Sequence, residues 1–406
     1  MNANGKLNIL QVHNFYQQPG GEDTVAANEK RLLEQAGHHV VTYYRSNAEL
    51  NELHGIKKFL IPFTAVFSIR TYCDIKRLIK EQSVDLVHIH NTHMRISPSV
   101  FYAARKMGVP AVQTLHNFRL ACPAGVFYRD GHICEECLQK GLGCAVKHSC
   151  YRSSKAQTAV NAAVTKIHQM LGTYRRAYFI CLTEFNRDKL LELNQNGKHI
   201  LDASRIFVKP NFTFRDERTS GEDGKGTMNP AARHFLFVGR LEPMKGINLV
   251  VEAFAQMPEM ELSVAGDGPL GEELRRYVAD NGIRNIHFLG QLDKKMLLEY
   301  YRTSAALILA SQWYEGFPMV ITEAYAHGLP VIAGNIGNLS SLVESGRTGM
   351  LYAYDSAEAL INAVRKFDES KHKDMQKNAA AFYETALSPS GNLAILEQIY
   401  QKILER

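Results

Sequence analysis

Short apolar runs, each followed by a turn and then a helix-like pattern, recur along the whole chain. In the first half they occupy residues 7–12, 39–44, 84–90, 109–115, 177–183 and 205–208. In the second half they occupy residues 234–238, 262–265 and 305–310. Continuous apolar runs of this length are typical of strands buried on both faces of a parallel sheet. Their alternation with helices predicts an α/β fold in which ligands bind at the carboxyl ends of the strands.

A polar segment interrupts this alternation at residues 212–232. Its charged residues and glycines are too polar to bury, so we predict a linker there. The linker would separate two Rossmann-like doubly wound domains, residues 1–211 and 233–388. A length of 406 residues supports two domains of this size. Residues 388–391 contain serine, proline and glycine, which predicts a hinge before a final helix within 389–406.

Composition narrows the class of protein. Hydrophobic residues make up 45% and charged residues 22% of the chain, as in a soluble globular protein. The formal net charge of +6 favours anionic ligands such as nucleotide diphosphates, lipid phosphates or a membrane surface. The polar N-terminus does not resemble a secretion signal, and no apolar run is long enough for a transmembrane helix. We therefore expect a cytoplasmic protein, with the inner face of the cell membrane as a further expected location.

The segment after the apolar run 305–310 carries the clearest chemical signal. Pro318 stands where a helix could begin, because its fixed φ suits the first helical position. Backbone amides at the start of such a helix have no intrahelical partners, and with the helix dipole they attract phosphate. The amides concerned are those of Phe317, Met319 and Val320.

Two glutamates frame this helix start. Glu323 would lie more than one turn into the helix and accept hydrogen bonds from ribose hydroxyls, while Glu315 would stay in the loop beside the sugar. By spacing alone, the two carboxylates could equally be solvated surface charges. A second element favours a binding site. Arg240 and Lys245 follow the apolar run 234–238 at a turn containing Gly239, where their charges could neutralise a departing diphosphate.

A third strand end adds small residues. The run 262–265 ends in Gly266-Asp267-Gly268-Pro269, where glycine would allow a ligand to approach the backbone. Taken together, these segments resemble the group 1 glycosyltransferases, known as family four. That family carries an arginine-lysine loop followed by two glutamates separated by seven residues. The Pro19-Gly20-Gly21-Glu22 loop and the strand end Thr114-Leu115-His116 fall in the expected order.

The resemblance implies the GT-B fold, with two Rossmann-like domains facing across a cleft and the last helix returning to the first domain. It implies a retaining transfer of a hexosyl unit from a UDP- or GDP-linked sugar, without a required metal cofactor. Arg240, Lys245 and the amides near Pro318 would stabilise the leaving diphosphate. Glu315 would orient the sugar, and the base would be recognised near Gln291. A glycan or lipid-linked acceptor in cell-surface polysaccharide synthesis is the setting implied.

The N-terminal half would supply the acceptor side. His116 ends a strand and, by the resemblance, would contact the donor or polarise the reacting hydroxyl; a lone histidine there could also be structural. Gly20 and Gly21 would approach the donor from across the cleft. His88 and His90 point to one face of a strand, but we find no nearby carboxylate to complete a metal site with them. We expect these two and His93 to be hydrogen-bonding residues that line the cleft.

Five of the seven cysteines lie between residues 122 and 150. Cys134 and Cys137 have the spacing of a zinc knuckle, and Cys144 and Cys150 could complete a structural zinc site. Unmetallated thiols are the alternative, since disulfides are improbable in a reducing compartment. Basic residues of the same loop could bind an acceptor phosphate: Arg129, Lys140, Lys147, His148, Arg152 and Lys155.

Cationic and apolar residues mix in the segment 57–80, as they do at a membrane surface, although an ordinary buried helix with a basic face gives a similar pattern. Three other functions are alternatives to glycosyl transfer. A paired-carboxylate glycosidase needs carboxyl groups about 5 Å apart, and has no use for the cations at 240 and 245. A nucleotide-sugar epimerase of the same fold remains an alternative. A zinc-stabilised nucleic-acid binder would need an exposed aromatic platform or a basic stripe, so we expect no nucleic-acid partner.

Overall fold

The computed structural model describes residues 5–17, 20–52, 54–55, 59–195, 197–215, 233–367 and 369–406. The chain forms two compact units. The N-terminal unit comprises residues 1–127, 135–211 and 392–406, and the C-terminal unit comprises 128–134 and 212–391. Most of the predicted linker, residues 216–232, lies outside the described residues.

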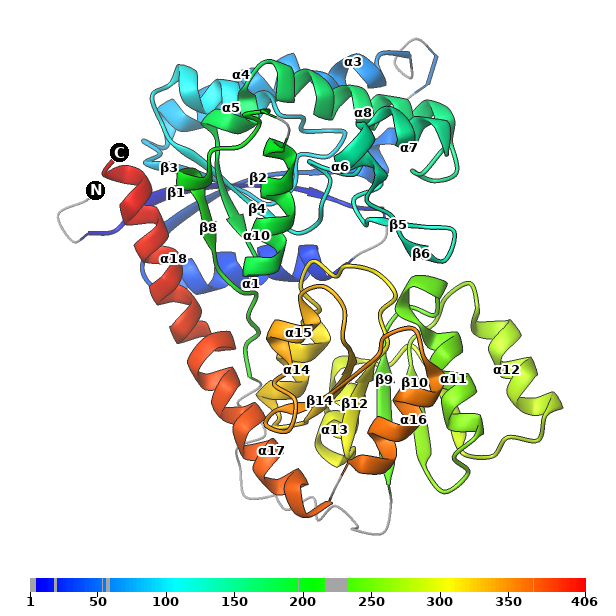
Figure 1. The fold of residues 1–406 in the computed structure, drawn as a ribbon. Coiled ribbons are helices and arrows are strands. Elements are labelled where there is room, and N and C mark those ends of the chain that lie inside the picture. The colour runs from blue at the N-terminus through cyan, green and yellow to red at the C-terminus, as the bar shows by residue number, and fades with distance from the viewer. Residues whose placement is uncertain are drawn as a thin grey trace. The chain divides into compact units, whose positions relative to one another are not determined.

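The N-terminal unit is built on a six-stranded parallel sheet (Figure 1). The strand order is β2-β1-β3-β4-β7-β8. The strands are β1 (Asn8–Phe15), β2 (His39–Ser46), β3 (Leu86–Ile89), β4 (Ala111–Leu115), β7 (Tyr178–Cys181) and β8 (Ile206–Val208). Each overlaps an apolar run of the sequence, as expected for strands covered on both faces.

Helices cover both faces of this sheet. α1 (Gly21–Gln35) and α18 (Pro389–Leu404) contribute Leu33, Leu396 and Tyr400 to a core shared with β1, β3, β4 and β7. In Figure 1 the helices α4, α5 and α8 lie on the opposite side of the sheet from α1. The remaining helices are α3 (Ile61–Val66), α4 (Ile69–Glu81), α5 (Ser99–Lys106), α6 (Glu136–Lys140), α7 (Gly143–Lys147), α8 (Lys155–Met170), α9 (Thr173–Arg176) and α10 (Glu184–Leu191).

The C-terminal unit has a second six-stranded parallel sheet, in the order β11-β10-β9-β12-β13-β14. Its strands are β9 (His234–Val238), β10 (Glu261–Ala265), β11 (Ile286–Gly290), β12 (Ala306–Leu309), β13 (Val331–Gly334) and β14 (Gly349–Tyr352). Its helices are α11 (Ile247–Ala255), α12 (Gly271–Asp280), α13 (Lys294–Thr303), α14 (Met319–Ala326), α15 (Leu339–Leu342), α16 (Ala357–Lys366) and α17 (Glu369–Phe382). A small antiparallel hairpin, β5 (Tyr128–Arg129) with β6 (His132–Ile133), also groups with this unit. The two Rossmann-like α/β units confirm the predicted fold class.

Each sheet has a point where the order of its strands reverses. In the C-terminal unit the chain runs outward from β9 through β10 to β11, then crosses to β12 and runs outward the other way. In the N-terminal unit the corresponding neighbours are β1 and β3. Loops leaving the carboxyl ends of two such strands diverge, which opens a crevice where doubly wound proteins bind ligands.

The end of the chain differs from the prediction. Residues 389–391 are not a hinge loop, because α18 begins at Pro389, directly after a π-helical turn at Tyr383–Leu387 and Ser388. Proline suits this position, since the first helical residue needs no N–H donor. The boundary between the two units falls after Gly391, inside α18.

Candidate functional site

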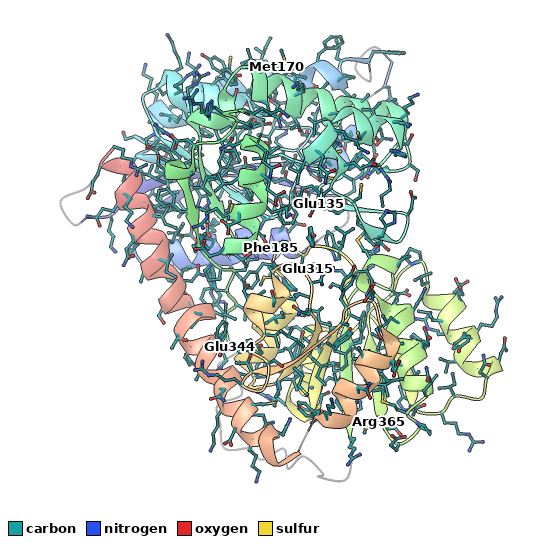
Figure 2. The ribbon with its side chains drawn as sticks, in the orientation of Figure 1. Glu135, Met170, Phe185, Glu315, Glu344 and Arg365 are labelled. Carbon is teal, nitrogen blue, oxygen red and sulfur yellow. The ribbon has the colours of Figure 1, made fainter. Side chains whose placement is uncertain are left out.

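The loops after β9 and β12 meet at the carboxylate of Glu315. The Nζ atom of Lys245 lies 2.8 Å from Glu315 Oε1, and the carboxylate is almost completely buried. Ser311 Oγ and Trp313 Nε1 donate to the same oxygen at 2.7 and 2.9 Å. The Lys245 ammonium also lies 5.0 Å from the centre of the Trp313 ring. Two residues predicted for the donor site therefore form one hydrogen-bonded cluster (Glu315 is labelled in Figure 2).

Asn338 holds the loop that carries Glu315. Its side-chain amide is buried and donates to the backbone carbonyls of Glu315 and Gly316 at 3.0 and 2.8 Å. Without these bonds, two buried carbonyls would need another donor. Asn338 could not be found from the sequence, because it follows β13 and meets the Glu315 loop only in the folded unit.

Glycines let neighbouring loops of this unit pack closely. Gly246 has φ +69°, and a Cβ there would lie 1.9 Å from the Ala310 carbonyl oxygen at the end of β12. Gly266 has φ +133°, and a Cβ there would lie 2.0 Å from the carbonyl oxygen of Gly239. The structure thus supplies a packing reason for the glycines at 246 and 266. Contact between a ligand and Gly266 stays a prediction.

Helix α14 begins one residue later than predicted. Pro318 is the N-cap residue, with ψ near 114°, and Met319 is the first helical residue. Pro318 therefore precedes the helix, and its carbonyl accepts from the Ile321 N–H at 3.1 Å. The amides of Met319 and Val320 come before this bond, which places them where helix N-termini bind anions.

Glu323 lies in the second turn of α14. Its carboxylate accepts a 2.8 Å hydrogen bond from Tyr301 of α13. Burial raises the pKa of Glu323, although Tyr301 and Lys294 act in the opposite direction. The carboxylate is therefore held in a fixed position inside the unit rather than solvated on its surface.

Two residues predicted for the donor site, Arg240 and Gln291, are more exposed than Lys245 and Glu315. Arg240 is about half exposed, and its Nε atom lies 3.5 Å from Glu242. Gln291 is an exposed residue directly after β11. The backbone N–H of Gly239 donates to the Ala265 carbonyl at 3.0 Å, so it bonds within the sheet edge.

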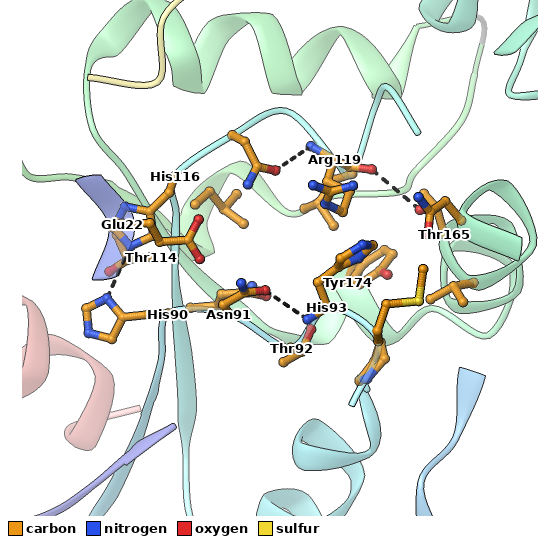
Figure 3. Close-up of a pocket in the computed structure, with 18 of the residues that line it drawn as sticks. Glu22, His90, Asn91, Thr92, His93, Thr114, His116, Arg119, Thr165 and Tyr174 are labelled. Atoms are coloured by element: carbon orange, nitrogen blue, oxygen red, sulfur yellow. Dashed lines mark hydrogen bonds between the residues drawn. The ribbon is translucent and has the colours of Figure 1, made fainter. Parts of the chain in front are cut away.

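The N-terminal unit has a pocket beyond the carboxyl ends of β3 and β4. His116 Nε2 lies 3.1 Å from His90 Nδ1, and the two rings stack with centres 5.4 Å apart. Burial lowers the pKa of His90 to about 4 and holds the pKa of His116 well below its usual value. Both rings are therefore neutral near pH 7. Figure 3 shows Glu22 and His116 at one end of this pocket and Thr165 at the other.

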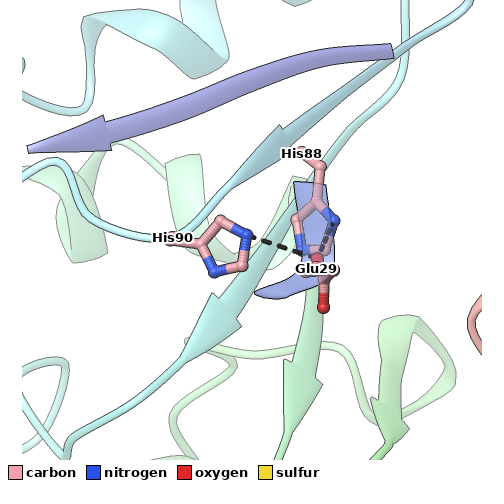
Figure 4. Close-up of side chains that lie close together, drawn as sticks. All are labelled: Glu29, His88 and His90. Carbon is pink, nitrogen blue, oxygen red and sulfur yellow. Dashed lines mark ion pairs between the residues drawn. The ribbon is translucent and has the colours of Figure 1, made fainter. Parts of the chain in front are cut away.

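His90 rests on a buried charge network. Glu29 Oε1 lies 2.8 Å from His88 Nδ1 and 3.2 Å from His90 Nε2, and all three side chains are fully buried (Figure 4). The expectation that no carboxylate lies near these histidines is therefore wrong. The carboxylate comes from α1, far away in sequence. Its signal was a glutamate on the apolar face of that helix, among the buried residues Val25, Ala26, Leu32 and Leu33.

Lys209 supplies the balancing charge. Its Nζ atom lies 3.1 Å from Glu29 Oε2 and donates to Asn392 Oδ1 at 2.8 Å. Burial alone would raise the pKa of Glu29, but His88, Lys209 and His90 outweigh it and hold that pKa well below its usual value.

His88 is hydrogen-bonded on both sides and does not line the pocket, contrary to expectation. Its Nδ1 atom lies 2.6 Å from the Tyr400 hydroxyl, and its Nε2 atom lies 2.8 Å from Thr114 Oγ1. Glu29, His88 and His90 form the one group of three metal-type ligands found among the described residues. Because an ammonium already neutralises the carboxylate, we interpret this group as an ion-pair network that supports His90.

Arg119 and Glu22 line the pocket and were not predicted as site residues. Burial raises the pKa of Glu22 to about 8, while Arg119 acts in the opposite direction. The Arg119 guanidinium also lies over the Tyr151 ring at 5.5 Å, and Tyr151 contacts His93 Nε2 at 3.2 Å. The pocket thus combines neutral imidazoles with the partly buried guanidinium of Arg119.

The glycine loop before α1 is occupied by its own helix cap. Gly20 is the N-cap residue, and its N–H donates to Asp23 Oδ2 at 3.0 Å. Asp23 also contacts His13 Nε2 at 2.8 Å. Gly21 is the first residue of α1 and is exposed, while Pro19 lies outside the described residues. Contact of Gly20 or Gly21 with a donor stays a prediction.

All seven cysteines are free thiols. Cys122 is buried, and Cys134, Cys137, Cys144 and Cys150 are partly buried. Burial raises the pKa of Cys137 to about 12, and the nearby Cys122, Cys144 and Cys150 contribute to this increase. Among the described residues, no three cysteine sulfurs lie close enough together to hold one metal ion. A structural zinc stays a prediction.

Two family models match this chain. Residues 19–212 match the family model of Glycosyltransferase Family 4, and residues 223–382 match that of Glycosyl transferases group 1. The chain belongs to the group 1 glycosyltransferases. An uncharacterised glycosyltransferase of Methanocaldococcus jannaschii is 22% identical to this glycosyltransferase over 385 residues, which cover 93% of each chain.

Solved structures share the fold. Sucrose-phosphate synthase of Thermosynechococcus elongatus matches with a TM-score of 0.68 at 19% identity, covering 98% of this chain and 100% of the other. Anabaena HepE in complex with UDP and glucose matches with a TM-score of 0.65 at 20% identity, with the same coverage. Together with the two parallel sheets, these matches confirm the GT-B fold of this glycosyltransferase.

Proposed function

We propose that this glycosyltransferase transfers a hexosyl unit from a UDP- or GDP-linked sugar to a glycan or lipid-linked acceptor, with retention of the anomeric configuration. Cell-surface polysaccharide synthesis is the setting we infer. The observation that carries the proposal is the meeting of Lys245 with Glu315 at the strand crossing of the C-terminal sheet, directly before the first amides of α14. UDP is the nucleotide to test first, because the fold neighbour HepE was solved with UDP and glucose.

The proposed donor site assigns a role to each part of this cluster. The ammonium of Lys245, the guanidinium of Arg240 and the amides of Met319 and Val320 would bind the diphosphate. Glu323, held by Tyr301, would accept from the ribose hydroxyls. Glu315 would orient the sugar hydroxyls.

In the free protein Lys245 is paired with Glu315, so its charge is already partly balanced. A bound diphosphate would compete for the same ammonium and leave Glu315 an acceptor for sugar hydroxyls. As the bond to the sugar breaks, negative charge grows on the diphosphate. Fixed cations and amides stabilise this charge more in the transition state than in the bound donor, which speeds the reaction.

The pocket of the N-terminal unit would receive the acceptor. His90 already uses both ring nitrogens, Nε2 toward Glu29 and Nδ1 toward His116. The second ring nitrogen of His116 would therefore orient the acceptor hydroxyl. In the proposed reaction the acceptor hydroxyl attacks from the side that the diphosphate leaves, and a diphosphate oxygen takes its proton. No side chain then needs to act as nucleophile.

Product analysis tests this proposal. UDP-hexoses and GDP-hexoses would be incubated with candidate acceptors, and the product's anomeric configuration would be read from its NMR coupling constants. We expect transfer with retention. An inverted product would contradict the proposed stereochemistry, and no transfer from any nucleotide sugar would contradict the donor class.

Incubation of the donor alone separates the epimerase alternative, because epimerisation needs no acceptor. A transferase should show only slow hydrolysis under these conditions. For the acceptor loop, we expect Lys147→Ala with Arg152→Ala to raise the acceptor KM while the donor KM stays constant. An unchanged acceptor KM would remove these two residues from the acceptor site.

A structural zinc can be tested on the purified chain by elemental analysis. We propose about one zinc per chain, lost together with thermal stability when Cys137 is replaced by serine. Metal-free protein with unchanged stability would leave the cysteines as plain thiols.

A further inference from the structure

Exposed apolar side chains concentrate on one part of the N-terminal unit. Among the described residues, eight large hydrophobic side chains are exposed, and two of them, Tyr277 and Met296, belong to the C-terminal unit. Phe59 is 80%, Phe63 72% and Met170 74% exposed. We define the apolar patch as the six in the N-terminal unit: Phe59, Leu60, Phe63, Ile69, Met170 and Leu171.

The two segments that carry the patch lie side by side, although they are distant in sequence. His168, in the last turn of α8, contacts the backbone carbonyl of Val66, the last residue of α3, at 2.9 Å. Phe63 precedes Val66 by about one turn, and Met170 follows His168 by two residues. Met170, labelled in Figure 2, lies on the side of α8 turned away from the sheet. A contiguous exposed apolar surface of this kind marks an interaction site.

The two sequence segments that carry the patch contain cations but no acidic residues. The sequence has no aspartate or glutamate between Glu52 and Asp74, and none between Glu136 and Glu184. The second of these stretches contains Lys140, Lys147, Arg152, Lys155, Lys166, Arg175 and Arg176. Lys166 and Arg175, next to the patch in sequence, are exposed. Apolar side chains bordered by cations fit an anionic lipid surface, where the former enter the acyl boundary and the latter meet headgroups.

We propose that the apolar patch docks this glycosyltransferase onto an anionic lipid bilayer. Among the described helices, none is long and apolar enough to cross a membrane, so the contact would be peripheral. A second copy of the chain fits less well, because a two-fold interface would bring the same unbalanced cations face to face. The expected segment 57–80 contributes only part of this surface: Lys57 and Lys58 lie outside the described residues, and α8 supplies the rest.

Vesicle flotation with the full chain tests the proposal. One set of vesicles would contain phosphatidylcholine, and the other an equal mixture of phosphatidylcholine and phosphatidylglycerol. We expect binding to the mixed vesicles that weakens as salt is raised, and weaker binding to the neutral vesicles. Replacing Phe59 and Phe63 by serine should lower the affinity about tenfold for each ring removed. Lys166→Glu with Arg175→Glu should remove the preference for phosphatidylglycerol.

The matched controls come from the C-terminal unit. Met296→Ser should leave binding unchanged, whereas Met170→Ser should lower it. Both methionines are exposed, but only Met170 belongs to the apolar patch. The proposal would be overturned if the wild type did not bind mixed vesicles. It would also be overturned if the variant with serine at 59 and 63 bound them as tightly as the wild type. So would a dimer in analytical ultracentrifugation that the same substitutions dissociate. Nucleotide binding by the C-terminal unit is a separate readout, so this proposal and the proposed function can fail independently.

Discussion

The two sheets place very different chemistry at the carboxyl ends of their strands. Where the C-terminal strand order reverses, Lys245 and Arg240 place cations after β9, and Lys245 is paired with Glu315. After β3 and β4 of the N-terminal sheet, His90 and His116 form a neutral pair whose pKa values are lowered by burial. The same fold thus carries charged side chains in one unit and neutral rings in the other.

The two regions also differ in where their charge is kept. In the N-terminal unit the ion pair of Glu29 and Lys209 is fully buried, and Glu29 contacts the pocket residue His90. In the C-terminal unit Lys245 is about one quarter exposed and can meet a ligand directly. The buried ion pair of the first unit can only hold side chains in position, whereas the exposed part of Lys245 in the second unit is open to a ligand.

The largest effect should come from breaking the buried pair. Lys209→Met would leave the Glu29 carboxylate without its ammonium, and we expect the free energy of unfolding to fall by about 3 to 5 kcal/mol. Denaturant unfolding measures this. Lys80→Met, on the exposed end of α4, is the matched control and should change little. The double variant Glu29→Leu with Lys209→Met should recover part of the loss; a single variant as stable as the wild type would contradict the network.

Removal of the accessible cation should affect activity rather than folding. We expect Lys245→Ala to lower kcat/KM about 100-fold, the size seen when one preorganised donor to a developing anion is lost. Steady-state kinetics with the donor varied would measure it, with Lys295→Ala on the exposed face of α13 as control. Equal activity of the two variants would remove Lys245 from the donor site.

The support of the Glu315 loop should matter next. Asn338→Ala leaves the carbonyls of Glu315 and Gly316 without their buried donor, so we expect a loss of about 1 to 3 kcal/mol in stability. Thermal unfolding would show it, and donor KM should rise as the loop loosens. Asn362→Ala, at an exposed position of α16, should show neither change.

A further expected effect appears only when pH is changed and concerns the N-terminal pocket. The pKa of Glu22 is raised to about 8 by burial, so the folded protein keeps a proton that the unfolded chain has lost. Stability from this group is present at low pH and is lost as pH rises toward 8. Compared with Glu22→Gln, the wild type should lose about 3 kcal/mol of stability between about pH 5 and pH 8. Parallel pH dependence of the two proteins in denaturant unfolding would contradict the raised pKa.

The sequence predicted the strands that leave continuous apolar runs, as at 234–238 and 305–310, but it did not single out β11, β13 or β14. It also placed Lys245 and Glu315 in loops after two such runs, and the structure brings these two side chains together. Their roles in donor binding stay predictions. It could not place Glu29 against His88 and His90, or Asn338 against Glu315. These contacts depend on which helix lies under which strand, and local pattern does not encode that. The start of α14 and the supposed hinge at 388–391 were each missed by a residue or a few, the usual uncertainty at helix ends.

The chain's one tryptophan offers the most direct test of the donor site. Trp313 donates to Glu315 and lies beside Lys245, so its fluorescence should report any nucleotide diphosphate that binds there. Titration with UDP and with GDP is predicted to give a saturable change for at least one of them, lost in Lys245→Ala and in Glu323→Ala. A folded protein whose tryptophan responds to neither nucleotide, or responds equally in both variants, would contradict a phosphate-binding site at the crossing of β9 and β12.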